Sequence, residues 1–226
     1  MKEFELRVVE VAAYGGSIRI ECEGPIPGAS AGQVCLALAS LSNQPDLPVQ
    51  LRVPLYFLPS RAKRAGFYVP ATHAYARLAP GDRLDLIGPA GRGFRLPPAG
   101  GRLLVIASSL ERLAAAVEAA LQRGLAVTVL TPRGGELLPA DVEIHRGPLD
   151  AELALWADTV ILDVADPAAR AARLRELAPG RAPDYVQALH TLPLPCGVGA
   201  CQACWVHLPH ANARKLACVD GPVFTY

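Results

Sequence analysis

The segment Cys196-Gly-Val-Gly-Ala-Cys201-Gln-Ala-Cys204 places three cysteines close together, and thirteen further residues lead to Cys218-Val-Asp-Gly-Pro-Val-Phe224. Four of the six cysteines therefore fall in one pattern, C-x4-C-x2-C-x13-C. The first three have the spacing of plant-type [2Fe–2S] ferredoxins. Gly197 and Gly199 allow the positive φ and close backbone approach of a loop that turns N–H groups toward a cluster. We predict that a [2Fe–2S] cluster is ligated by Cys196, Cys201, Cys204 and Cys218.

The main alternative is structural Zn²⁺, whose sites usually pair two C-x2–4-C knuckles. Only one true C-x2-C is present, so the cluster is favoured. His207 and His210 lie between the ligands and could replace cysteines in a Rieske-type arrangement. Because four cysteines suffice, both are read as exposed hairpin residues. Trp205 is expected to pack over the cluster and exclude water, with an exposed partner contact as the alternative.

Length and composition restrict the class of protein. The 226 residues suffice for one large domain or two small ones, and the net charge of +1 argues against nucleic acid as a partner. No apolar run approaches the roughly 18 residues of a membrane span, and the start of the chain does not resemble a secretory signal. Clustered cysteines in such a chain more often bind metal than form disulfides, so a cytoplasmic location is predicted.

Residues 1–99 show short apolar strands separated by Gly/Pro turns, which indicates a small antiparallel β-barrel. Cys22 and Cys35 fall on predicted strands, and we interpret them as small buried hydrophobes rather than reactive thiols. The predicted strands lie near residues 4–11 and at 17–22, 34–39, 49–57, 66–69 and 83–87, with one short helical stretch at 72–78.

Residues 100–190 alternate buried strands with amphipathic helices, the pattern of a parallel α/β sheet. Such sheets bind nucleotides where a glycine-rich turn follows a strand. Here the first turn is Ala107-Ser-Ser-Leu-Glu111, which has no glycine and carries a negative charge. Ser108 or Ser109 is expected to be a helix N-cap. The turn is predicted to be a poor dinucleotide site.

The cysteine segment resembles the electron-transfer subunit of the NAD-dependent, flavin/iron–sulfur type of dihydroorotate dehydrogenase, within the ferredoxin–NADP reductase superfamily. The resemblance rests on C-G-V-G-A-C-x-x-C, on L-A-C-V-D-G-P-V-F, on Gly32-Gln33 and on the D-x-x-G-P-x-G-x-G-F phrase that ends at Phe94. It implies a barrel of the FAD-binding type (1–99), a nucleotide-binding-like α/β domain (100–190) and a [2Fe–2S] segment (191–226). In the family, FAD takes electrons from NADH and passes them through the cluster to FMN in a catalytic partner subunit.

The chain departs from the family at its flavin and nicotinamide phrases. The family's R-P-x-S is Val53-Pro-Leu-Tyr56 here, and Arg52 is one residue out of register, which points it to the other face of a strand. A G-T pair is reduced to Ala71-Thr72, and the G-G-G-x-G and C-G-x-x-x-M phrases are replaced at 107–111 and 162–167. The resemblance leaves Tyr56, Thr72 and Gly88 as FAD contacts. It leaves FAD binding open and predicts the loss of NAD binding.

Together these features predict an iron–sulfur electron-transfer subunit that relays electrons between a flavin or other carrier and a partner dehydrogenase. By resemblance, that partner is an FMN-containing, dihydroorotate dehydrogenase-like catalytic subunit of pyrimidine biosynthesis. The alternative is a degenerate reductase fold that serves docking or assembly in a redox complex, with no flavin or NAD chemistry of its own.

Overall fold

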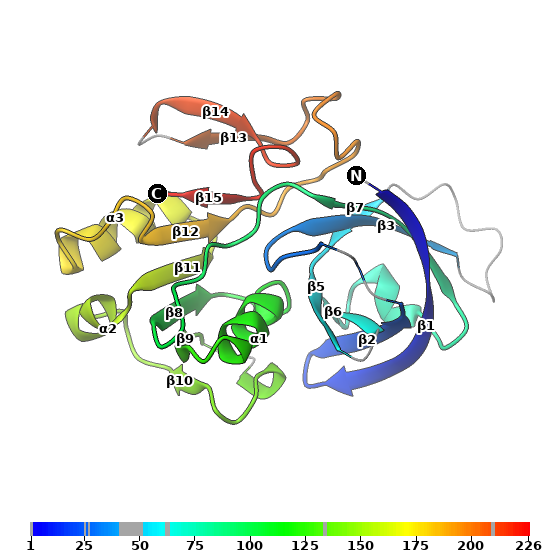
Figure 1. The fold of residues 1–226 in the computed structure, drawn as a ribbon, viewed down its shortest axis with the longest axis horizontal. Coiled ribbons are helices and arrows are strands. Elements are labelled where there is room, and N and C mark those ends of the chain that lie inside the picture. The colour runs from blue at the N-terminus through cyan, green and yellow to red at the C-terminus, as the bar shows by residue number, and fades with distance from the viewer. Residues whose placement is uncertain are drawn as a thin grey trace.

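The computed structural model describes residues 2–24, 26, 28–40, 52–61, 64–132, 135–208 and 211–226. A β-barrel and an α/β lobe lie side by side, and a small hairpin lies over the edge of the α/β sheet (Figure 1). This is the predicted fold class: an antiparallel barrel, a largely parallel α/β sheet and a C-terminal cysteine segment.

The barrel is a seven-stranded antiparallel sheet of order β4-β3-β7-β1-β2-β6-β5. Its two end strands, β4 and β5, are consecutive in the chain and separated only by Tyr56, so the sheet curls until its ends nearly meet. The predicted strand at 49–57 corresponds to β4 and β5, and residues 49–51 lie outside the described residues. The elements are β1 (Lys2–Tyr14), β2 (Ser17–Glu23), β3 (Val34–Ser40), β4 (Val53–Leu55), β5 (Phe57–Arg61), β6 (Arg64–Pro70), η1 (Ala74–Arg77) and β7 (Arg83–Ala90).

The barrel interior is filled by alternate residues of its strands. Leu6 and Val8 of β1 face inward beside Ile20 and Cys22 of β2, while their neighbours face solvent or the other lobe. Burial raises the pKa of the Cys22 and Cys35 thiols to about 12, so both stay protonated and pack as small hydrophobes, as predicted.

The α/β lobe is a six-stranded sheet of order β10-β9-β8-β11-β12-β15, parallel except for the last pair. Central strands β8 and β11 are buried on both faces, which explains their continuous apolar sequence. The elements are β8 (Arg102–Ala107), α1 (Ala114–Gln122), β9 (Ala126–Leu130), η2 (Gly135–Leu137), β10 (Glu143–His145), α2 (Ala151–Trp156), β11 (Thr159–Asp163), α3 (Pro167–Leu177), β12 (Val186–Leu189) and β15 (Val223–Thr225).

The prediction that Ser108 or Ser109 caps the first helix was wrong. Helix α1 begins at Ala114 after Leu113, with no side-chain cap, and residues 111–113 form the turn that precedes it. The Ser109 hydroxyl instead hydrogen-bonds the Glu111 carboxylate. Because the Glu111 carboxylate takes the Ser109 hydroxyl, that hydroxyl is not available to cap a helix, and α1 begins later than the preference of serine for the N-cap position suggests.

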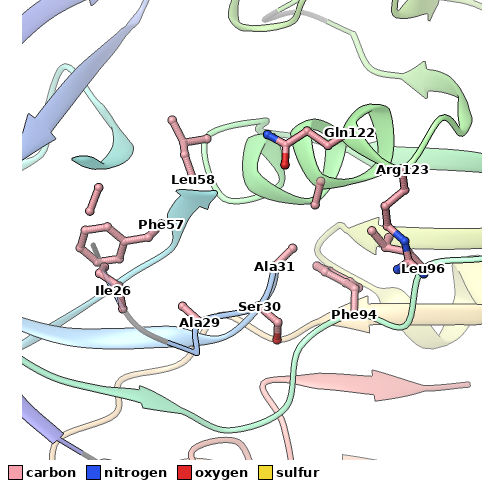
Figure 2. Close-up of a pocket in the computed structure, with 12 residues that line it drawn as sticks. Ile26, Ala29, Ser30, Ala31, Phe57, Leu58, Phe94, Leu96, Gln122 and Arg123 are labelled. Carbon is pink, nitrogen blue, oxygen red and sulfur yellow. The ribbon is translucent and has the colours of Figure 1, made fainter. Parts of the chain in front are cut away.

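One apolar core joins the two lobes. Tyr56, Leu58 and Tyr68 of the barrel belong to the same buried cluster as the strands of the α/β sheet. Beside this contact, a mostly apolar cavity of about 360 Å³ lies between the barrel and α1, with Phe57 and Leu58 on one side and Gln122 and Arg123 toward the helix (Figure 2). The lobes therefore pack directly on each other.

The cysteine segment is built into the α/β sheet. Strands β13 (Trp205–Leu208) and β14 (Ala213–Leu216) form an antiparallel hairpin, after which β15 pairs with β12 at the sheet edge (Figure 1). The predicted hairpin turn at 209–212 includes Pro209 and His210, which lie outside the described residues. Among the described residues, no helix is long and apolar enough to cross a bilayer.

Candidate metal centre

Two of the four cysteines meet at the base of the hairpin. Cys204 directly precedes β13 and Cys218 follows β14, and the amide of Ala217 donates to the Cys204 carbonyl. This pairing places the two sulfur atoms 3.4 Å apart, and both residues are buried. Burial and the neighbouring Cys204 raise the pKa of the Cys218 thiol to about 12, so the site favours removal of the thiol proton only when a cation is present.

The other two cysteines form an outer pair. The amide of Cys201 points at the Cys196 sulfur across 3.4 Å, and Cys201 is exposed. Amides of Cys201, Val198 and Ala200 lower the pKa of Cys196 to about 6. Gly197 (φ 66°) and Gly199 (φ 80°) adopt the left-handed conformation that turns these amides inward. The loop thus stabilises negative charge on sulfur.

The surface around the cysteines is unusually apolar. The largest exposed hydrophobic side chains of the described residues include Val198, Trp205 and Val219, all within the cysteine segment. Trp205 is 45% exposed, on the outer side of the hairpin, with the Arg214 guanidinium 5.5 Å from its ring. The exposed-contact alternative therefore describes Trp205 better than a water-excluding lid. His207 is exposed, as predicted, and His210 lies outside the described residues.

The three candidate flavin contacts occupy different surroundings. Tyr56 is 6% exposed between the lobes, and its hydroxyl oxygen is buried without a hydrogen bond of good geometry. Gly88 lies in β7, where an added Cβ would stand 2.7 Å from the Cys35 sulfur, so it serves close strand packing. Thr72 is exposed and lines a cavity of about 470 Å³ between the lobes.

The cavity at Thr72 is acidic. Glu111 and Glu136 line it together with Ser17, Ser108 and Ser109, and the described residues of its lining include no lysine or arginine. Burial alone would raise the pKa of Glu111, but hydrogen bonds from Ser109 and Ser17 outweigh it and lower that pKa. An ionised carboxylate then faces the position where a dinucleotide pyrophosphate would lie. These residues do not fit that group.

A direct side-chain contact joins the lobes beside this cavity. The Ser17 hydroxyl of the barrel donates to the Glu111 carboxylate of the α/β lobe across 2.6 Å. Within the α/β lobe, Arg112 forms a bidentate pair with Asp163 at 2.8 and 3.1 Å. Arg52 lies just before β4 rather than on a strand, and its guanidinium binds Asp85 of the barrel at 2.7 Å. The sequence did not identify these pairs, because the partners are far apart in the chain.

A two-lobed reductase-type fold that ends in an iron–sulfur-binding cysteine segment defines the class of this protein. The family described as the iron–sulfur cluster binding domain of dihydroorotate dehydrogenase B matches residues 194–226. The fold is similar to an NADH-dependent reduced ferredoxin–NADP oxidoreductase, with a TM-score of 0.64 and 17% identity over 97% of this chain and 87% of that chain. A ferredoxin reductase of carbazole 1,9a-dioxygenase has a TM-score of 0.58 over 83% of this chain and 66% of that chain, at 17% identity.

Curated relatives narrow the class to one family. The dihydroorotate dehydrogenase B (NAD(+)) electron transfer subunit of Bacillus caldolyticus is 32% identical over 176 residues, 68% of this chain and 67% of the relative. That of Desulforamulus reducens is 28% identical over 179 residues, 68% of each chain. The chain belongs to this family of electron transfer subunits.

Proposed function

We propose that the chain holds a [2Fe–2S] cluster through Cys196, Cys201, Cys204 and Cys218. The arrangement in two pairs carries the proposal: a two-iron cluster takes two thiolates per iron, whereas a structural zinc ion needs four ligands around one point. Among the described residues, no three Cys, His, Asp or Glu side chains converge on a single point. The inner pair excludes water, and the outer pair lies on a loop whose amides stabilise thiolate charge.

We infer that the cluster exchanges electrons with a partner at the exposed rim of Val198, Trp205 and Val219. An apolar rim around an exposed ligand, Cys201, is a surface that a protein partner would cover. Because the relatives are named as subunits of dihydroorotate dehydrogenase B, the partner we propose is an FMN-containing, dihydroorotate dehydrogenase-like catalytic subunit, in pyrimidine biosynthesis. A cytoplasmic location suits the six free cysteines, because thiols stay reduced there.

The electron source we propose is not NADH bound to this chain. The acidic lining at Thr72 opposes a pyrophosphate, whether of NAD or of FAD, and Tyr56 is enclosed. The assignment of Tyr56, Thr72 and Gly88 to FAD stays a prediction that the chemistry of the cavity opposes. We therefore propose that electrons reach the cluster without FAD bound in this cavity.

Anaerobic reconstitution of the full chain with iron and sulfide tests the cluster. The wild-type chain and Cys22→Ala should bind iron and sulfide in equal amounts, with visible bands that bleach on reduction. Cys204→Ser should lose most of this absorbance, because one iron loses a buried thiolate. Purification with one zinc ion per chain, or an unchanged spectrum in Cys204→Ser, would contradict the proposal.

The direct contact between the lobes at Ser17–Glu111 favours one second candidate, a docking or assembly subunit. In that case the two lobes and the cluster serve as a scaffold, and the cluster exchanges no electrons with the catalytic subunit. The chain reduced with dithionite would then stay reduced when mixed with an FMN-containing dihydroorotate dehydrogenase catalytic subunit. Rapid reoxidation in the same mixture selects the electron relay.

A further inference from the structure

A basic groove lies beside the cysteine segment, apart from the rim of Val198, Trp205 and Val219. It encloses about 280 Å³ between the joint of the two lobes, the sheet edge at β15 and the hairpin. Its lining includes three cations, Arg92, Arg95 and Lys215. The one carboxylate among the described lining residues, Asp220, accepts a hydrogen bond from the Leu216 amide at 3.1 Å.

Buried hydrogen bonds hold the backbone that carries the two arginines. Gln187, 2% exposed within the apolar sheet, accepts from the Arg95 amide at 2.8 Å and donates to the Arg95 carbonyl at 2.7 Å. The Arg92 amide donates to the Gly221 carbonyl, and Phe94 bonds Ala31 at 2.8 Å. Burying a polar side chain in a sheet core costs free energy unless its polar atoms form hydrogen bonds, so the bonds from Gln187 fix the backbone at Arg95.

Lys215 approaches the groove from the hairpin. It pairs with Val206 in β13, so its side chain shares the face on which Val206 and Leu208 are buried. That face is directed toward the sheet, while Arg214 and His207 lie on the other face. Lys215 is three residues before Cys218, which puts the groove next to the predicted inner ligands.

The three cations are locally unbalanced. None of their side chains has a hydrogen bond or ion pair within the described part of the chain, whereas Arg7, Arg19, Arg52, Arg64, Arg83, Arg112 and Arg173 all pair with carboxylates. The chain as a whole carries only +1. The positive potential of the groove is therefore a local feature, of the kind that steers a negatively charged partner.

We propose that this groove docks an acidic one-electron carrier protein, which serves the cluster in place of a nicotinamide. In the transfer, the reduced carrier loses one electron and the oxidised cluster gains it, with no proton or covalent bond involved. The inference rests on the proposed [2Fe–2S] cluster. A protein partner suits this groove because the groove is open to solvent and its cations come from two separate segments of the chain.

Stopped-flow transfer tests the groove in the reconstituted full chain. The probe is a plant-type [2Fe–2S] ferredoxin, an acidic protein, reduced beforehand by illumination with 5-deazariboflavin and EDTA as the electron donor. The second-order rate constant should fall steeply with salt, and Arg92→Glu, Arg95→Glu and Lys215→Glu should each lower it about tenfold at low salt. Arg77→Glu, an exposed barrel position, is the matched control and should leave it unchanged.

Photoreduction of the chain itself by 5-deazariboflavin, with no ferredoxin present, distinguishes a failure of the docking groove from a failure of the proposed cluster. A variant with normal visible bands and normal direct reduction, but slow ferredoxin transfer, supports the groove. Equal rate constants for electron transfer from ferredoxin to Arg92→Glu and to Arg77→Glu would overturn the proposal. It would also be overturned if the wild-type chain bound inorganic phosphate and Arg92→Glu abolished that binding without slowing electron transfer, because the groove would then be a small-anion site. A wild-type chain that takes up no cluster contradicts the proposed function instead.

Discussion

Gly91→Ala tests how the cysteine segment is joined to the barrel. Gly91 follows β7 with a φ of 74°, and an added Cβ would overlap the carbonyl oxygen of Gly221. The same carbonyl accepts from the Arg92 amide, and Arg92 forms a bridge with Pro222. Because the obstacle is backbone, room for a methyl group can be made only by moving Gly221 and disturbing this joint.

Two contributions set the expected loss of stability. The left-handed conformation costs alanine about 1–2 kcal/mol, and overpacking against a fixed neighbour adds about 1–3 kcal/mol. The free energy of unfolding should therefore drop by about 2–5 kcal/mol. Gly100→Ala is the control, since Gly100 has a φ of 80° but nothing within 4 Å of an added Cβ. It should lose only the conformational part.

Urea unfolding, followed by circular dichroism and by cluster absorbance in parallel, measures both variants. Gly91→Ala should unfold at lower urea than Gly100→Ala, and its cluster absorbance should be lost before the circular dichroism of the sheet. The difference between the two variants in the free energy of unfolding, about 1–3 kcal/mol, measures the steric cost of the close approach of Gly221. Equal midpoints for Gly91→Ala and Gly100→Ala would refute the reasoning, because both share the conformational cost.

Three further substitutions test other contacts. The pKa of Glu111 is lowered in the folded chain, so its ionised carboxylate stabilises the fold near neutral pH, and this stabilisation is lost as pH falls through that pKa. Glu111→Gln should therefore lower the free energy of unfolding by about 1 kcal/mol at pH 7, and by progressively less in acid, as measured by urea titration. Tyr56→Phe removes a buried hydroxyl whose contact with Thr191 falls short of hydrogen-bond geometry, and it should leave the melting temperature equal or higher; a fall would show that the Thr191 contact stabilises the fold. Gln187→Leu strands the Arg95 amide and carbonyl and should cost at least about 2 kcal/mol, which hydrogen exchange at Arg95 would localise; unchanged protection there would contradict the bonding.

The sequence predicted the two-lobed architecture because the apolar pattern that distinguishes one kind of strand from another lies within a few neighbouring residues. The apolar run of β8 marks a strand buried on both faces, and the alternation in β7 marks a barrel wall. The same holds for the cysteine loop, where Gly197 and Gly199 lie between the residues they position. Cysteine spacing could therefore predict the candidate ligands, whereas their grouping into inner and outer pairs required the hairpin.

Contacts between residues far apart in the chain could not be predicted from the sequence. Nothing near Glu111 indicates that Ser17, 94 residues away, donates to it. The basic groove likewise combines Arg92 and Arg95 with Lys215, more than a hundred residues later, and none of the three stands out in a chain of 22 basic and 21 acidic residues. Pairings at this separation depend on the packing of the lobes, which local propensity does not encode.

Different contacts surround the acidic cavity and the cysteine segment. The Ser17–Glu111 hydrogen bond joins the barrel to the turn after β8, beside the acidic cavity. Strand β15, which pairs with β12, and the Arg92–Pro222 bridge attach the cysteine segment to the sheet edge and to the barrel joint. No described hydrogen bond or ion pair links Glu111 to the cysteine loop, so a change in the chemistry of the acidic cavity need not disturb the cysteines. The proposed iron–sulfur site is therefore independent of dinucleotide binding at the acidic cavity, provided that electrons reach it from outside the chain.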